Sequence, residues 1–388
     1  MSSNVSRFRV LFAGVGSGGH IYPLIAVYHS LKSYLEARGI LLDARYFGNA
    51  KSYAPYLERE GVKTVSVMGS KLRRYGSIAN LFAPFAFAFG FLQALIKIYF
   101  FMPDVVFSKG GPGAYAIILA ARWYRVPVVI HESDAIAGIT NRLSAKHAKV
   151  VCLSFEQAQS YFGSAKTHFV GTPVRKYLRL EESPATSRLA LGLPDPLPTL
   201  FVVGGSQGAQ ALNNFILENA ELLLAEFAIV HQVGPANYKA YKREFDFMSK
   251  NFNPELLKRY HAVAYLSDSE MATALNACDL VVSRAGSSIF EFAAMGKPAI
   301  LVPIPTSANN HQRANAYAFS DHGAGLVIEE ENLRPSLFIQ QIKRLLADKN
   351  RLERMKMSAG TFYKPDAAER IAEDILSSSD IAGSLAGK

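Results

Sequence analysis

The sequence contains very little cysteine. Among 388 residues only Cys152 and Cys278 are cysteines, and they lie far apart with no Cys-x-x-Cys pair or Cys/His spacing. A disulfide framework is therefore excluded by count, and a zinc site is not expected. A long apolar run near the N-terminus is also missing, because the short run at residues 9–13 leads directly into glycines. We therefore expect no signal peptide and a location in the cytoplasm.

Acidic residues are fewer than basic ones, 32 against 42, which gives a formal net charge of +10. This charge predicts attraction to nucleic acid, to a phosphate-bearing substrate or to the inner leaflet of a membrane, and it does not choose among them. Nucleic acid is the least favoured, because the basic residues are dispersed and no recognition motif is present. The length suits two domains, and 49% hydrophobic residues suffice for large cores.

The stretch 281–305 carries the most informative pattern. A short β-branched run at 280–283 is followed by a glycine turn, a helical run at 289–295 and a second strand at 299–302. Ser287 or Ser288 is a candidate N-cap, and the free N–H groups of a helix start suit a diphosphate. The Glu291 carboxylate, one turn further on, can accept hydrogen bonds from the two hydroxyls of a ribose. The pattern therefore predicts a nucleotide site in a parallel sheet.

A second glycine turn, residues 14–20, follows the predicted strand at 9–13 and precedes a helix from about residue 23 to 37. Such a turn lets a ligand approach the backbone closely. The next strand ends at residues 46–48 without a carboxylate, which argues against a dinucleotide cofactor. His20 lies at the start of the helix. It is interpreted either as a general base kept neutral by the helix N-terminus or as a hydrogen-bonded helix-start histidine.

Polar clusters follow two further predicted strands. The strand at 104–108 ends in Lys109-Gly-Gly-Pro-Gly113, and the strand at 126–130 ends in His131-Glu132-Ser-Asp134, with Asn141 on the next helix. Open α/β sheets bind ligands at the carboxyl ends of their strands. These clusters are therefore candidate site residues.

The pattern of strand, glycine turn and helix begins again after residue 199. Residues 181–199 are rich in proline and polar residues, which is typical of an interdomain linker. A strand at 200–203 then leads into Gly204-Gly-Ser-Gln-Gly208 and a helix through residue 223, with further strands at 227–232, 262–266 and 280–283. We therefore expect two doubly wound domains that face each other. Residues 309–315 begin a helix whose polar side chains either reach a sugar or are solvated.

Residues 78–101 form a Phe-rich apolar run that is long enough to span a bilayer. Polar and helix-breaking residues interrupt it, so two packed or interfacial helices are preferred to a span. The run is either a core helix of the first domain or an exposed apolar face that docks on anionic lipid. In the second case the docking surface comprises Lys71, Arg73, Arg74, Leu81, Phe85 and Phe89.

Six groups of residues, in order, resemble the motifs of one enzyme family. They are Gly16-Ser-Gly-Gly-His20 with Pro23, His131-Glu132 with Gly138 and Asn141, Gly171-Thr-Pro-Val-Arg175, Gly204-Gly-Ser-Gln-Gly-Ala209, Arg284-Ala-Gly286 with Glu291 and Gly296-Lys-Pro298, and His311-Gln312 with Asn315. Over roughly residues 8–370 the chain is similar to the MurG family of peptidoglycan N-acetylglucosaminyltransferases, glycosyltransferase family 28.

The resemblance implies an α/β protein with a GT-B fold, in which two Rossmann-like domains have parallel sheets facing a central cleft. Residues 1–174 would form the N-terminal acceptor and membrane-docking domain, 175–199 the linker, and 200–365 the C-terminal UDP-GlcNAc-binding domain. Residues 366–388 would form a C-terminal helix, packing back on the N-terminal domain, and a disordered tail.

The resemblance also implies a reaction. The family transfers GlcNAc, with inversion, from UDP-GlcNAc to the C4 hydroxyl of MurNAc in undecaprenyl-pyrophosphoryl-MurNAc-pentapeptide (lipid I), which gives lipid II for peptidoglycan synthesis. It acts as a peripheral protein at the cytoplasmic face of the cell membrane. A single displacement needs one base and stabilisation of the leaving UDP, which helix dipoles and arginine supply, so we expect no metal and no cofactor.

The family's functional residues carry over where positions match. His20 would be the catalytic base, Glu291 would hold the ribose, Leu266 would lie near the uracil, and Gln312 and Asn315 would contact the GlcNAc hydroxyls. Ser206, Arg175 and the helix start at Ser287 and Ser288 would hold the diphosphate. The full donor-binding set is Ser17, Gly18, Gly19, Asp134, Asn141, Arg175, Ser206, Gln207, Leu266, Arg284, Gly286, Ser287, Ser288, Glu291, His311, Gln312 and Asn315.

The chain departs from the family pattern in three places. Ser133-Asp134 stands where the family usually has Gln-Asn, Pro112 stands where a Tyr is common, and the 284–291 loop is one residue shorter than expected. Other hypotheses therefore stay open. The chain could be another GT-B UDP-sugar enzyme, such as a glycolipid glycosyltransferase or a UDP-GlcNAc 2-epimerase, or a noncatalytic scaffold that binds a nucleotide sugar at the membrane.

Overall fold

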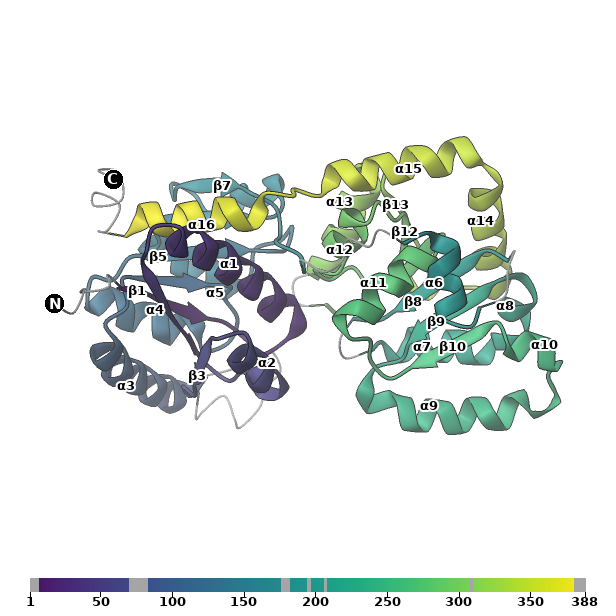
Figure 1. The fold of residues 1–388 in the computed structure, drawn as a ribbon, viewed down its shortest axis with the longest axis horizontal. Coiled ribbons are helices and arrows are strands. Elements are labelled where there is room, and N and C mark those ends of the chain that lie inside the picture. The colour runs from purple at the N-terminus through teal and green to yellow at the C-terminus, as the bar shows by residue number, and fades with distance from the viewer. Residues whose placement is uncertain are drawn as a thin grey trace. The chain divides into compact units, whose positions relative to one another are not determined.

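The computed structural model describes residues 7–69, 83–175, 182–193, 197–205, 208–307 and 310–379. The chain forms two compact units, one of Met1–Val174 with Lys364–Lys388 and one of Arg175–Tyr363 (Figure 1). Six residues that the sequence singles out lie outside the described residues: Lys71, Arg73, Arg74, Leu81, Ser206 and Gln207.

The first unit is built on a seven-stranded, wholly parallel sheet with the order β3-β2-β1-β4-β5-β6-β7. Parallel strands are covered on both faces, which explains why the central strands are apolar at almost every position. The strands are β1 (Arg7–Ala13), β2 (Leu41–Phe47), β3 (Lys63–Val65), β4 (Val105–Ser108), β5 (Val128–Glu132), β6 (Val150–Leu153) and β7 (Thr167–Phe169).

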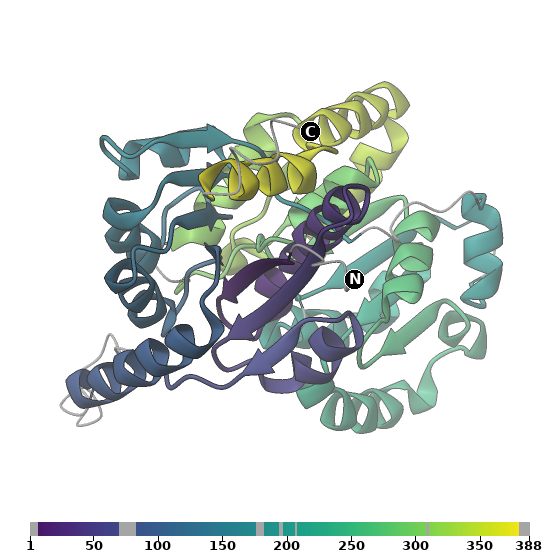
Figure 2. The same ribbon diagram turned by 60° about the vertical axis from the view of Figure 1, so that its left-hand side comes forward.

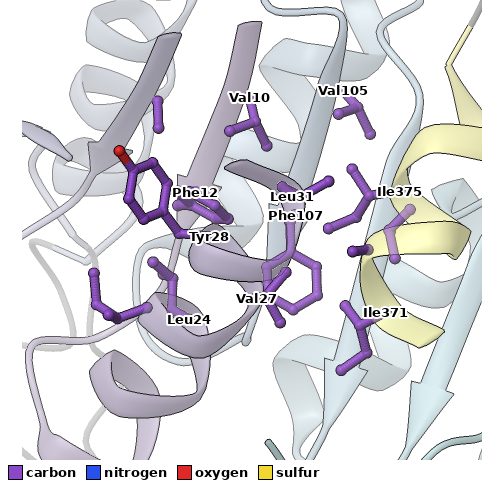
Figure 3. Packing of buried hydrophobic residues seen from close by; sticks show 14 of the residues in the cluster. Val10, Phe12, Leu24, Val27, Tyr28, Leu31, Val105, Phe107, Ile371 and Ile375 are labelled. Carbon is purple, nitrogen blue, oxygen red and sulfur yellow. The ribbon is translucent and has the colours of Figure 1, made fainter. Parts of the chain in front are cut away.

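Helices cover both faces of this sheet. They are α1 (Gly18–Glu36), η1 (Lys51–Tyr53), α2 (Ala54–Arg59), α3 (Ala83–Phe101), α4 (Ala114–Trp123), α5 (Ile139–Ser144), η3 (Ala145–His147), η4 (Glu156–Tyr161) and α16 (Ala367–Ser378). The last helix, α16, packs beside α1 against β4, β5 and β6. Its Ile371 and Ile375 join Val10 and Phe12 of β1 and Phe107 of β4 in one buried cluster (Figure 3).

Polar contacts also fix α16 on the first unit. Asp374 of α16 accepts hydrogen bonds from the buried Cys152 thiol of β6 (3.3 Å) and pairs with His168 of β7 (2.8 Å). The C-terminal helix is thus an integral part of the first unit, at the far end of the sequence.

Of the apolar run at 78–101, the described residues form one helix, α3 (Ala83–Phe101), where two helices were expected. It packs on α4 and lies at the periphery of the first unit (Figure 2). Five of its exposed large side chains, Phe85, Phe89, Leu92, Ile96 and Phe100, follow one another at intervals of three or four residues. Such intervals place them on one face of a helix. The interpretation of this run as a core helix is therefore wrong for the described part.

The second unit contains a six-stranded parallel sheet with the order β10-β9-β8-β11-β12-β13. Its strands are β8 (Thr199–Val203), β9 (Ala228–Gln232), β10 (Tyr260–Val263), β11 (Leu280–Ser283), β12 (Ala299–Leu301) and β13 (Gly325–Val327). The strand that the sequence predicts at 262–266 begins and ends earlier, so Leu266 lies in the loop after β10.

The helices of the second unit begin inside the expected linker. They are α6 (Pro184–Ala190), α7 (Gln210–Glu218), α8 (Ala220–Glu226), α9 (Pro235–Met248), η6 (Ser249–Asn251), α10 (Pro254–Leu257), α11 (Asp268–Ala277), α12 (Ile289–Ala294), α13 (His311–Asp321), η8 (Glu330–Asn332), α14 (Pro335–Ala347) and α15 (Lys349–Phe362). Helix α6 packs on α11 and carries an Arg188–Asp279 ion pair of 2.8 Å. The helix predicted through residue 223 is interrupted at Asn219.

The strand order of each sheet reverses at one point. In the first unit the chain builds outward from β1 to β3 and then returns to place β4 on the other side of β1; in the second unit β8 and β11 have the same relation. Loops at the carboxyl ends of such neighbouring strands form the crevice in which open α/β sheets bind ligands. The glycine turns after β1, β4, β8 and β11 all lie at these points.

Candidate active site

The glycine turn after β1 leads into α1 five residues earlier than the sequence predicts, because α1 begins at Gly18. A Cβ on Gly16 would collide with the carbonyl of Ala50, so this position requires glycine. Ser17 occupies the N-cap position, and no hydrogen bond from the helix N–H groups reaches its side chain. Gly18, Gly19 and His20 form the first helical turn.

His20 lies between the glycine turns that follow β1 and β4. A Cβ on Gly14 would be 3.5 Å from Nδ1 of His20, and a Cβ on Gly111 would be 3.4 Å from Cε1. Nδ1 is buried, and no hydrogen-bond partner reaches it from the described residues. Burial, together with the positive charge of Lys109, lowers the pKa of His20 to about 3. The imidazole is therefore neutral at physiological pH and can accept a proton.

Lys109 and His131 form a buried pair beside this histidine. Nε2 of His131 lies 2.9 Å from the carbonyl oxygen of Gly171, which can only accept, so Nε2 carries the hydrogen. Nδ1 of His131 then accepts from the Lys109 ammonium at 2.8 Å. Burial and the Lys109 charge lower the pKa of His131 well below its ordinary value. Burial lowers the pKa of Lys109 to about 8, although the nearby Glu132 and Asp134 carboxylates act in the opposite direction.

Glu132 organises the loop that contains Asp134 and leads to Asn141. Its carboxylate accepts from the backbone N–H of Asp134 (3.0 Å), that of Gly138 (2.9 Å) and Nδ2 of Asn141 (3.0 Å). Burial and the charge of Asp134 raise the pKa of Glu132, while these three donors lower it in part. Oδ1 of Asn141 is buried with no partner in the described chain.

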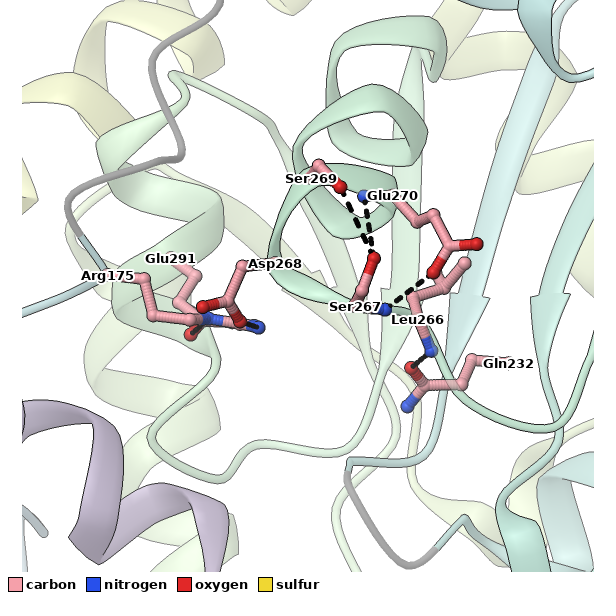
Figure 4. Close-up of polar contacts among 8 residues, drawn as sticks. All are labelled: Arg175, Gln232, Leu266, Ser267, Asp268, Ser269, Glu270 and Glu291. Atoms are coloured by element: carbon pink, nitrogen blue, oxygen red, sulfur yellow. Dashed lines mark hydrogen bonds and ion pairs between the residues drawn. The ribbon is translucent and has the colours of Figure 1, made fainter. Parts of the chain in front are cut away.

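In the second unit, Arg175 binds two carboxylates (Figure 4). Its Nε and Nη2 donate to the two carboxylate oxygens of Glu291, each at 2.8 Å, and Nη1 donates to Asp268 at 2.8 Å. Glu291 is the third residue of α12, and Asp268 is the first residue of α11. Two residues that the sequence assigns to the diphosphate and the ribose are thus brought together, through a partner, Asp268, that it does not identify.

Leu266 is buried and is held by Gln232, the last residue of β9. Oε1 of Gln232 accepts from the Leu266 N–H at 3.0 Å, and its Nε2 donates to the carbonyl of Gly205 at 3.2 Å. Ser267 and Glu270 follow as a capping box at the start of α11 (Figure 4).

Other predicted donor-binding residues hold the loops around β11. Arg284 donates to the carbonyl of Val302 (2.8 Å) and pairs with Glu330. Asn315 is fully buried and donates to the carbonyl of Ala285 at 3.0 Å. Gln312, at the start of α13 beside His311, accepts from the N–H of Ile304 at 3.2 Å.

The small residues after Arg284 leave space. A Cβ on Gly286 would meet no atom within 4 Å. Ser287 and Ser288 are half-buried, and Ser288 is the N-cap of α12 with no side-chain cap bond. This loop therefore presents short side chains and backbone at the carboxyl end of β11.

The predicted residues fall into two groups. Ser17, Gly18, Gly19, His20, Asp134 and Asn141 belong to the first unit; Arg175, Leu266, Arg284, Gly286, Ser287, Ser288, Glu291, His311, Gln312 and Asn315 belong to the second. Lys109 lies in a polar cluster that the sequence marks as a candidate, but no role was assigned to it, and Asp268 and Gln232 were not identified as site residues. The sequence marks Gln232 only by its position, because it is a polar residue at the carboxyl end of an apolar strand.

Two doubly wound parallel sheets, each with glycine turns at the point where its strand order reverses, are the architecture of the GT-B fold. Solved structures match this architecture across the chain. MurG from Acinetobacter baumannii is 26% identical with a TM-score of 0.69, over 95% of this chain and 99% of that one. UDP-GlcNAc 2-epimerase from Neisseria meningitidis has a TM-score of 0.66 at 14% identity, over 95% and 99% of the two chains, which is a likeness of fold alone.

Sequence relationships are more specific. The glycosyltransferase family 28 N-terminal domain matches residues 10–153, and the family 28 C-terminal domain matches residues 199–371. The chain belongs to glycosyltransferase family 28. It is 33% identical to the UDP-N-acetylglucosamine--N-acetylmuramyl-(pentapeptide) pyrophosphoryl-undecaprenol N-acetylglucosamine transferase of Acetivibrio thermocellus, over 95% of this chain and 97% of the relative. The enzyme of the same name from Treponema denticola is 32% identical, with the same coverage of both chains. The predicted family and fold are confirmed.

Proposed function

We propose that the protein transfers GlcNAc from UDP-GlcNAc to the C4 hydroxyl of MurNAc in lipid I and thereby forms lipid II for peptidoglycan synthesis. The full-length similarity to curated transferases of this specificity carries the proposal. Two structural features support it. The glycine turns where each strand order reverses are suited to binding phosphate, and the Arg175–Glu291 pair is suited to binding the ribose.

His20 is proposed as the base that removes the proton from the acceptor hydroxyl. This role is supported by its neutral imidazole, whose buried Nδ1 has no hydrogen-bond partner among the described residues. A pKa of about 3 makes a weak base. A weak base suffices when the transition state has oxocarbenium character, since the hydroxyl becomes acidic only as its new bond to the sugar forms.

The donor is proposed to bind the second unit. Glu291 can accept from the ribose hydroxyls while Arg175 holds it, because a carboxylate offers about four acceptor positions and the arginine fork uses two. The short loop Gly286–Ser288 leaves room for the diphosphate, with Arg175 supplying positive charge. Leu266 is proposed to lie against the uracil, and His311 and Gln312 beside the sugar.

The face of α3 is proposed to dock on anionic lipid at the cytoplasmic side of the membrane, as a peripheral contact. Phe85 and Phe100 are 73% and 79% exposed. Trp123, at the end of the neighbouring helix α4, is also exposed, and Arg122 and Arg125 flank it in the sequence. An apolar stripe beside basic residues suits a membrane surface. In the described chain α3 is also the one helix long and apolar enough to cross a membrane.

Product analysis tests the proposal. The protein is incubated with UDP-GlcNAc and a short-chain lipid I analogue, with each substrate omitted in turn. Formation of a β-linked GlcNAc–MurNAc product that needs both substrates supports transferase activity. A sugar isomer formed from UDP-GlcNAc alone would indicate an epimerase, and UDP-GlcNAc binding without any product would indicate a scaffold.

A further inference from the structure

We propose that Gln232 is a positioning residue for the UDP part of the donor, and that it acts by tying together two loops of the second unit. These are the glycine turn after β8 and the loop after β10. The inference rests on the proposed donor site and adds a residue to which no role in that site has been given.

Gln232 has the right place in the sheet for this role. It is the last residue of β9, and β9 lies between β8 and β10. The side chain is 1% exposed. Both ends of its amide are used, since Nε2 donates to the carbonyl of Gly205 and Oε1 accepts from the N–H of Leu266. One side chain therefore bridges the two loops.

The described glycines of the turn after β8 lie close to the end of β9. Gly205 and Gly208 have φ values of +85° and +76°, which glycine adopts without strain. The carbonyl of Gly205 accepts from the N–H of Gly208 at 3.0 Å as well as from Gln232. A Cβ on Gly208 would collide with the carbonyl of Val233, the residue after Gln232. Gly205 and Gly208 are thus bonded to each other, and Gly208 packs directly on the end of β9.

The loop after β10 is fixed at three successive residues. The Leu266 N–H is bound by Gln232, the Ser267 N–H is bound by Glu270 at 2.7 Å, and the Asp268 carboxylate is bound by Arg175 at 2.8 Å. Arg175 in turn holds Glu291. Gln232 therefore connects the proposed phosphate turn to the segment that leads to the proposed ribose site.

Two substitutions separate the two hydrogen bonds. Gln232→Met removes both at similar volume. Gln232→Glu keeps an oxygen for the Leu266 N–H but faces the Gly205 carbonyl with a carboxylate that cannot donate. The matched control is Asn276→Leu at the opposite end of α11, where the amide donates to the Glu182 carbonyl (2.9 Å) and to Ser187 (3.0 Å).

The measurements are calorimetric binding of UDP, inhibition by uridine, and KM for each substrate. Gln232→Met removes both hydrogen bonds that hold the two loops, so it is expected to raise the Kd of UDP and the KM of UDP-GlcNAc about 10-fold. The KM for the lipid I analogue should stay unchanged, as should all constants in Asn276→Leu. Gln232→Glu should weaken the binding of UDP more than the binding of uridine.

A purely structural role for Gln232 predicts a lower melting temperature with unchanged UDP binding in the folded variant, and that result would overturn the inference. Wild-type protein that binds UDP but makes no lipid II analogue would refute the proposed acceptor and leave the Gln232 result standing. Wild-type protein that binds no UDP would overturn both.

Discussion

Arg175 and Glu291 form a bidentate ion pair in which two guanidinium nitrogens each lie 2.8 Å from a different carboxylate oxygen. Their side chains are only 6% and 12% exposed. Arg175 is also the first residue of the second unit, and Glu291 lies in the helix after the β11 turn. The pair therefore anchors the start of this unit to its proposed nucleotide site.

Removing the arginine should destabilise the second unit. Arg175→Met leaves the buried Glu291 carboxylate and the half-buried Asp268 carboxylate without their partner, which costs about 3–5 kcal/mol of unfolding free energy. Arg175→Met with Glu291→Gln removes one of these charges and should recover part of the loss, while UDP binding stays weak in both variants. Thermal unfolding and calorimetry measure the two effects. A double variant less stable than the single one would contradict the pairing.

The pH dependence of kcat/KM should show no histidine limb between pH 5 and 7. The pKa of His20 in the free enzyme is lowered to about 3, so the base is already deprotonated throughout this range. Lys109→Met removes a charge that lowers this pKa, so the acid limb should move to higher pH. Burial is the larger cause, so the limb should stay below 6.5. A wild-type limb near pH 6.5 would show that His20 titrates as an exposed histidine.

Lowering the pH should lower the free energy of unfolding of the second unit through His231. This side chain is fully buried between Tyr260 (2.8 Å) and Asn213 (3.1 Å), and burial lowers its pKa to about 3. Its ordinary pKa is about 6.5, so below that pH the unfolded chain binds a proton that the folded chain excludes. The contribution of His231 to the free energy of unfolding therefore falls as the pH falls, by about 2 kcal/mol from pH 6.5 to 5. Urea unfolding of wild type and His231→Gln should show this difference, and identical pH dependence would refute it.

Membrane docking should depend on the exposed phenylalanines of α3. Phe85→Ser with Phe89→Ser is expected to weaken binding to anionic vesicles about 10-fold or more, because each phenylalanine loses apolar contact with the bilayer. Phe247→Ser is the matched control, since Phe247 is 70% exposed on α9 of the second unit. Sedimentation with vesicles measures the effect. If the control lost vesicle binding to the same extent, or if the α3 variant lost none, α3 would not be the docking surface.

Local patterns predicted the sheets well, because buried parallel strands and glycine turns leave strong signals in sequence. The turn after β11, with Ser288 as the N-cap of α12 and Glu291 in its first turn, follows the prediction closely. Helix α6 was missed because its short polar sequence resembles a linker, and packing on α11 decides its structure.

Contacts between distant residues could not be predicted in this way. The bonds from Gln232 to Gly205 and Leu266 join residues 27 and 34 positions apart. The bonds from Arg175 to Asp268 and Glu291 join residues 93 and 116 positions apart. Such pairings arise from the order of strands in the sheet and from packing, which periodicity and residue preference do not encode.

The most direct test of the account measures GlcNAc transfer to a short-chain lipid I analogue by wild type, His20→Ala and His29→Ala. His29 lies on the same helix but binds Glu60 at 3.0 Å, away from the glycine turns. We expect product with wild type and His29→Ala, and a kcat about 10²- to 10⁴-fold lower for His20→Ala with unchanged UDP binding. Full activity of His20→Ala would contradict the proposed base, and absence of product from wild type that binds UDP-GlcNAc would contradict the proposed reaction.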